Sequence, residues 1–130
     1  MSNLFSVISP LHSALNYHLE RSSVLASNVA HVDTPGFKPK DLERVSFNDS
    51  FTAALRVTNE RHMGGAPTSL ENGRVFTDLS AGGGKDGNFV SLDREAAKVA
   101  ANQMRYDVIS AVASAELRGL AFAASDGRGG

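Results

Sequence analysis

Apolar residues recur at steps of three and four in two segments of this chain, one near each end. Along the first segment the repeat passes through Ile8, Leu11, Leu15, His18, Ser22, Leu25, Val29 and Val32. Along the second it passes through Leu92, Ala96, Val99, Gln103, Tyr106, Ala113, Leu117 and Leu120. This spacing is typical of a coiled-coil seam, so the pattern predicts one long helix near each end.

Capping and breaking residues predict where the first helix begins and ends. Ser9 followed by Pro10 fits an N-cap and the first helical position, where a missing N–H costs nothing. After Val32, Pro35 moves Thr34 out of the helical region, and Pro35-Gly36 suits the central positions of a type II turn. We therefore expect the helix to stop at this turn.

The second helix has its own start signal. Ser91 or Asp93 can serve as its N-cap, and neither glycine nor proline occurs from Asn88 to Arg118. The pattern predicts a helix over residues 91–125.

The middle of the chain has a different composition. Residues 33–90 hold 8 of the 12 glycines. Three apolar residues spaced four apart predict a short helix near residues 47–58, and Asn72-Gly73 between short apolar runs suggests a small hairpin near residues 68–77. The rest of this segment is expected to be irregular.

These elements predict a mainly α structure. The two long helices pair most economically as an antiparallel, coiled-coil-like hairpin joined by the long glycine-rich middle. The chain is expected to be one structural unit with four parts: an N-terminal helix (residues 1–32), an irregular segment that begins with the turn (33–90), a C-terminal helix (91–125) and a flexible tail (126–130).

Neither helix has a fully charged outer face. Glu20 and Arg21 are the only Asp, Glu, Lys or Arg residues between Ser2 and Val32. The second half of the C-terminal helix is likewise composed mostly of small and apolar residues. Because one partner helix does not cover such surfaces, we expect self-association or packing among similar subunits.

Overall composition excludes several classes of function. Thirteen basic and fourteen acidic residues give no electrostatic reason to expect a nucleic-acid partner. The chain has no cysteine, so disulfides, thiolate nucleophiles and cysteine metal sites are excluded. It shows neither a standard cleaved secretory signal nor an apolar run long enough to span a membrane.

The titratable residues suggest no catalytic or metal site. The four histidines, His12, His18, His31 and His62, follow no metal-binding spacing, and His18 is interpreted as a packed residue. Asp93 and Glu95 diverge on a helix and are interpreted as helix-start charges, and Asp86-Gly87-Asn88 as a turn. We therefore expect no enzymatic activity, no cofactor, no metal and no small-molecule substrate.

Asn28 is the polar residue of greatest interest in the first helix. It could bond across to another helix or subunit and fix the register, or bond its own helix backbone or water. The candidate assembly residues are Leu11, Leu15, Leu25, Asn28, Val29, Asp33, Thr34, Pro35, Gly36, Phe37, Val99, Gln103, Tyr106, Leu117 and Leu120.

Two motifs carry a resemblance to a known family. The sequence LASNVAHVDTPGFK, residues 25–38, resembles the signature of flagellar axial proteins, which form the rod and the hook. The sequence DGNFVSLDREAAKVAANQMRYD, residues 86–107, resembles the C-terminal motif of the B-type basal-body rod proteins, the proximal rod subunits. His31 departs from the first signature, where asparagine is usual.

The resemblance implies a structural subunit of the bacterial flagellar rod, which serves motility. Such a subunit would polymerise through its terminal helices in the periplasmic rod, as part of the drive shaft and export channel. It would be exported unfolded by the flagellar type III apparatus without signal cleavage. Its implied partners are itself, neighbouring rod subunits, the membrane-ring or rod adaptor proteins and the export gate.

Two alternatives remain at the level of sequence. One is another axial subunit, such as the C-type rod protein. The other, of a different class, is a flagellar export chaperone or a wall-modifying enzyme. An enzyme would need convergent titratable residues, and the sequence shows none. A chaperone would stay soluble and expose a groove, whereas a rod subunit should polymerise.

Overall fold

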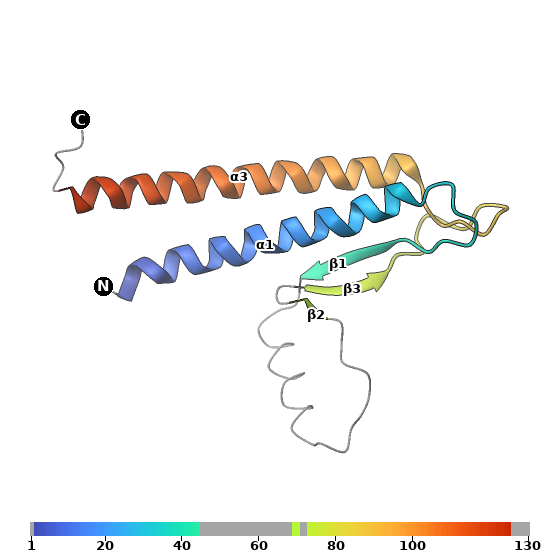
Figure 1. Ribbon diagram of the computed structural model, residues 1–130, viewed down its shortest axis with the longest axis horizontal. Helices are drawn as coiled ribbons and strands as arrows, with labels where there is room; N and C mark the ends of the chain where they lie inside the picture. The colour runs from blue at the N-terminus through green and yellow to red at the C-terminus, as the bar shows by residue number, and fades with distance from the viewer. Residues whose placement is uncertain (1, 45–68, 71–72, 126–130) are drawn as a thin grey trace, which may run out of the picture.

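Two long helices make up most of the computed structural model, which describes residues 2–44, 69–70 and 73–125. Helix α1 spans Ser2–Ala30 and helix α3 spans Leu92–Ala124. They lie side by side and antiparallel, so that the start of α1 and the end of α3 are found at the same end of the helix pair (Figure 1). The predicted mainly α hairpin is confirmed.

Helix α1 begins earlier than the sequence predicts. Pro10 lies inside it, and not at its first position. Proline removes one backbone hydrogen bond and crowds the preceding turn, but its fixed φ is close to the helical value. The helix therefore continues through it, and the predicted start at Ser9 is wrong.

The predicted turn after α1 is present. Phe37 N donates to Thr34 O at 3.2 Å, and Gly36 has a φ of 73°. These are the hydrogen bond and the positive φ that a type II turn requires. The turn directs the chain away from the hairpin toward a small sheet.

The sheet has three antiparallel strands in the order β1-β3-β2, with bounds Lys40–Arg44, Gly73–Thr77 and Ser69–Leu70. The predicted hairpin corresponds to β2 and β3, paired through Ser69 with Arg74 and Leu70 with Gly73. Strand β1 was not predicted, because its sequence KDLER is mostly charged and has one apolar residue. The helix predicted near residues 47–58 lies outside the described residues.

Helix α3 begins after Ser91, which occupies the N-cap position in an extended conformation without a side-chain capping bond. The face that α3 turns toward α1 differs from the apolar seam read in the sequence. Glu95 and Asn102 are each only 3% exposed, whereas Val99 and Leu117, members of that seam, are 37% and 55% exposed. The expected seam of α3 is therefore only in part its contact face with α1. Its members Tyr106, Ala113 and Leu120 are half-buried, and polar residues of α3 bond to polar side chains of α1 on this face.

Candidate functional site

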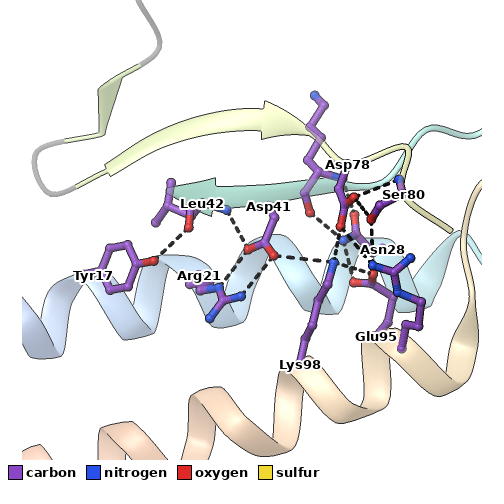
Figure 2. Close-up of polar contacts among 11 residues, drawn as sticks. Tyr17, Arg21, Asn28, Asp41, Leu42, Asp78, Ser80, Glu95 and Lys98 are labelled. Carbon is purple, nitrogen blue, oxygen red and sulfur yellow. Dashed lines mark hydrogen bonds and ion pairs between the residues drawn. The ribbon is translucent and has the colours of Figure 1, made fainter. Parts of the chain in front are cut away.

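Asn28 lies where α1, α3 and strand β1 meet, and it is 1% exposed. Its amide Nδ2 donates to Lys40 O at 2.6 Å and to Glu95 Oε2 at 2.8 Å, while its Oδ1 accepts from Lys40 N at 2.9 Å (Figure 2). The first of the two sequence interpretations is thus confirmed, since Asn28 bonds across to the other helix. One side chain fixes three elements relative to one another.

Side chains of α1 also close the outer edge of strand β1. Asn28 bonds both backbone groups of Lys40, and the Tyr17 hydroxyl donates to Leu42 O at 2.8 Å. Leu42 N donates to the Asp41 carboxylate at 2.7 Å. These bonds replace those of a further strand and prevent another chain from adding to this edge.

Asp41 forms a fork-like ion pair with Arg21 of α1. Arg21 Nε lies 2.8 Å from Asp41 Oδ1, and its second nitrogen lies 3.0 Å from Oδ2. Burial raises the pKa of Asp41, but the Arg21 hydrogen bond, the Leu42 N–H and the charge of Lys98 outweigh it, so the net pKa is lowered. The Asp41 hydrogen bond is the main cause that raises the pKa of Arg21.

Lys98 of α3 lies among three carboxylates. Its Nζ is 2.7 Å from Asp78, 3.0 Å from Glu95 and 3.5 Å from Asp41 (Figure 2). Burial lowers the pKa of Lys98, but the hydrogen bonds to Asp78 and Glu95 outweigh it and raise the pKa overall. The Lys98 hydrogen bond is also the main reason that the pKa of Asp78 is well below its usual value.

Arg94 completes the charge balance of this cluster. It donates to Ser80 Oγ at 2.7 Å and lies 4.0 Å from Asp78. We call the cluster the polar junction. It consists of three cations and three carboxylates with Asn28 between them: Arg21, Arg94, Lys98, Asp41, Asp78, Glu95 and Asn28.

A second cluster holds the turn after α1. Asn88 Nδ2 donates to Val32 O at 2.6 Å and to His31 O at 3.1 Å, and thereby caps the end of α1. Gly36 N donates to Asp86 O at 3.1 Å, and Phe89 N donates to Phe37 O at 3.0 Å. The turn motif near the first helix and the Asp86-Gly87-Asn88 motif near the second are therefore in direct contact.

A positive φ explains the glycines at this contact, because side chains with a Cβ rarely adopt it. Gly36 and Gly87 each have a φ of 73°, whereas a Cβ on Gly87 would make only an ordinary contact, 3.6 Å from the Gly36 Cα. Nearby, the His31 ring stacks on Phe37 with centroids 4.3 Å apart, and its Nδ1 donates to Ser27 O at 2.7 Å. His31 thus fixes the aromatic residue of the turn against α1.

His18 and Asn102 form a reciprocal pair between the helices. Asn102 Nδ2 donates to His18 O at 2.8 Å, which fixes the amide orientation because a carbonyl only accepts. Asn102 Oδ1 then accepts from His18 Nδ1 at 2.8 Å. With Asn28, this pair sets the register of α1 against α3 at two positions, and the packed role predicted for His18 agrees with it.

The carboxylates of the polar junction are engaged within the fold. The carboxylates of the polar junction are bonded to cations or to Asn28, and the described ranges contain no group of three or more His, Cys, Asp or Glu side chains suited to a metal. Among these same residues, no helix is both long and apolar enough to cross a membrane.

The predicted assembly residues fall into three classes of exposure. Leu25 and Asn28 are buried. The half-buried ones are Leu11, Leu15, Val29, Phe37, Tyr106 and Leu120. The exposed ones are Asp33, Thr34, Pro35, Gly36, Val99, Gln103 and Leu117. Their contacts in an assembly stay a prediction.

Sequence reasoning missed the roles of several residues of the polar junction and of the His18–Asn102 pair. Glu95, Lys98 and Asn102 follow the same three-and-four spacing as the apolar seam, and this regular polar spacing was the available signal. Asp41 and Asp78 carry no such signal, because the fold alone brings them to Lys98.

Comparison with known proteins finds relatives over most of the chain. The chain is 27% identical to the flagellar basal body rod protein FlgB of Escherichia coli K12, with 82% of the chain and 84% of the relative covered. It is 30% identical to FlgB of Aquifex aeolicus, with 81% and 82% covered, and 29% identical to FlgB of Buchnera aphidicola, with 82% and 85% covered. No protein-family model matches the chain.

Proposed function

Because this chain belongs to the FlgB family of flagellar basal body rod proteins, we propose that it is a subunit of the proximal rod that polymerises through its terminal helices. The polymer forms part of the drive shaft and surrounds part of the export channel. The role is mechanical, in keeping with relatives that are named flagellar basal body rod proteins.

The main support for this proposal is that α1 and α3, held in a fixed register, leave apolar surface exposed. The polar junction and the His18–Asn102 pair hold α1 and α3 together. Yet large apolar side chains of α3 remain exposed, including Met104 at 68% and Val108 at 64%. Contiguous exposed apolar surface of this kind supports a subunit that neighbours cover.

The family and the fold also support a location and a route. We place the protein in the periplasmic rod of the basal body, reached unfolded through the type III apparatus without signal cleavage. Contacts such as Asn28 to Glu95 join residues 67 positions apart, so this part of the hairpin closes only after Glu95 has emerged. Its partners are further copies, neighbouring rod subunits, the ring or adaptor proteins and the export gate.

Deletion of the gene tests the proposal. Cells that lack it should be non-motile and should carry membrane rings without a rod, as seen by electron microscopy of isolated basal bodies. Expression of the intact gene from a plasmid should restore both. Intact rods in the deletion strain would contradict the proposed function.

A further inference from the structure

We propose that neighbouring copies of this chain pack face to back, with the outer face of α3 in one copy lying on the outer face of α1 in the next. This inference rests on the proposed function, because it specifies the surfaces through which the subunit polymerises. The inference is drawn from two rows of exposed residues, which we call stripes, on opposite sides of the helix pair.

The outer α3 stripe lies away from α1. Asn102 faces α1, and Met104, two residues later, points about 200° around the helix from it. From Met104 the exposed residues continue at steps of three and four on this outer side. The outer α3 stripe consists of Met104, Val108, Ala111, Ala115, Gly119 and Phe122, all exposed.

The outer α1 stripe lies away from both α3 and the sheet. Asn28 faces α3 and β1, while Ala26 and Ala30, two residues to either side of it, are exposed. Leu19 is 53% exposed on the same side. The outer α1 stripe consists of His12, Asn16, Leu19, Ser23, Ala26 and Ala30, of which all but the half-buried Asn16 are exposed.

The two stripes match in length, charge and size. Each spans 18 residue steps (122 − 104 and 30 − 12), or about 27 Å of helix. Neither contains Asp, Glu, Lys or Arg. Each stripe contains three small residues, Ala111, Ala115 and Gly119 on α3 and Ser23, Ala26 and Ala30 on α1, which allow the close approach that helix packing requires.

The spacing and placement of the two stripes indicate what kind of partner binds them and how the copies assemble. A three-and-four period fits another helix and not an extended peptide. Because the stripes differ and lie on opposite faces, pairing them uses one face of each copy and leaves the other free. Such a heterologous contact continues from copy to copy into a ring or a helical polymer, whereas an isologous contact would stop at a dimer.

Disulfide trapping tests the contact directly, because the natural chain has no cysteine. Ser23 lies two residues after the midpoint of the outer α1 stripe. Ala115 lies two residues after the midpoint of the outer α3 stripe, and Ala111 lies two residues before that midpoint. Purified Ser23→Cys chains are mixed with Ala115→Cys chains, which reports parallel packing, or with Ala111→Cys chains, which reports antiparallel packing. After mild oxidation, one of the two mixtures should give a mixed disulfide between the two variants.

The control is Ser13→Cys, which changes an exposed serine of α1 off the stripe. It should give at least tenfold less mixed disulfide than Ser23→Cys. Equal cross-linking of the two serine variants, predominant dimers of the Ala115→Cys chain with itself, or a chain that stays monomeric at every concentration would each overturn the inference. The presence of a rod in the deletion strain is a separate readout. A rodless deletion strain together with a failed cross-link would remove only this contact and leave the rod assignment standing.

A charge on the stripe gives a second measurement. Ala115→Asp should abolish sedimentable polymer, while Ala121→Asp, the same change at an exposed alanine off the stripe, should leave it. Circular dichroism of both variants checks that the helices remain. Polymer formed equally by both folded variants would overturn the inference.

Discussion

Truncation of Asn28 to alanine should destabilise the folded monomer strongly. The change removes three hydrogen bonds at a side chain that is 1% exposed. It leaves the N–H and the C=O of Lys40 and one oxygen of Glu95 without these partners. A buried polar group left unpaired costs about 1–3 kcal/mol, and because the two Lys40 groups are only part-buried, the loss should be about 2 kcal/mol or more.

The loss is measured as the change in free energy of unfolding, from urea titrations followed by circular dichroism at concentrations where sedimentation shows a monomer. Asn16→Ala is the matched control, because Asn16 lies on the same helix and makes one long contact, 3.5 Å to His12. It should change the free energy of unfolding by less than about 0.5 kcal/mol.

A nearly isosteric variant separates lost bonding from lost packing. Asn28→Asp keeps the shape of the side chain but replaces the donor that faces Lys40 O and Glu95 with an acceptor. It should therefore destabilise the fold at least as much as Asn28→Ala, and adding Glu95→Gln should recover part of the loss. If Asn28→Ala stays within 0.5 kcal/mol of the natural chain, the reasoning about this site is wrong.

Two further predictions concern the turn and the acid response. Gly36→Val should lower the unfolding free energy by on the order of 1–2 kcal/mol, because Gly36 has a φ of 73°, even though a Cβ there would meet no other atom within 4 Å. Gly119→Ala, in the interior of α3, should instead stabilise the fold. Equal effects of the two changes would refute this account. The lowered pKa values of Asp41 and Asp78 mean that the unfolded chain binds more protons. Stability should therefore be fully present above about pH 4 and fall as the pH drops further. Asp78→Asn should reduce this loss of unfolding free energy at low pH, measured by urea titrations at several pH values. An unchanged pH dependence of the unfolding free energy would contradict the assignment.

The raised pKa of Lys98 affects stability at high pH. Its contribution to stability is present below about pH 10.4, its ordinary value, and is lost as the pH rises through the higher folded value. Near neutral pH Asp41, Asp78 and Lys98 are therefore all charged.

Local chemistry was sufficient to predict much of the fold. The two helices follow from the three-and-four period, and the turn follows from Pro35-Gly36, because the conformations of proline and glycine are set by their own covalent structure. The start of α1 could not be predicted in this way. Ser9-Pro10 is compatible with a helix start but does not require one, since proline also occurs within helices at a cost.

Strand β1 and the facing side of α3 depended on partners remote in sequence. Residues 40–44 have little strand preference of their own, and they are held by β3 on one edge and by Asn28 and Tyr17 on the other. Helix α3 has apolar residues around much of its circumference, so its periodicity alone does not determine which side faces α1.

Residue pattern and turn chemistry were enough to predict two long helices, the turn that ends the first, the β2–β3 hairpin and the surplus of uncharged helix surface. The folded arrangement was needed to show that polar groups join the two helices, and that the turn after α1 touches the Asp86-Gly87-Asn88 motif. The physical reason is the distance along the chain between the residues that interact. Helical period and turn conformation arise within a few residues, whereas a buried carboxylate or amide is stable only beside partners that the folded chain brings to it.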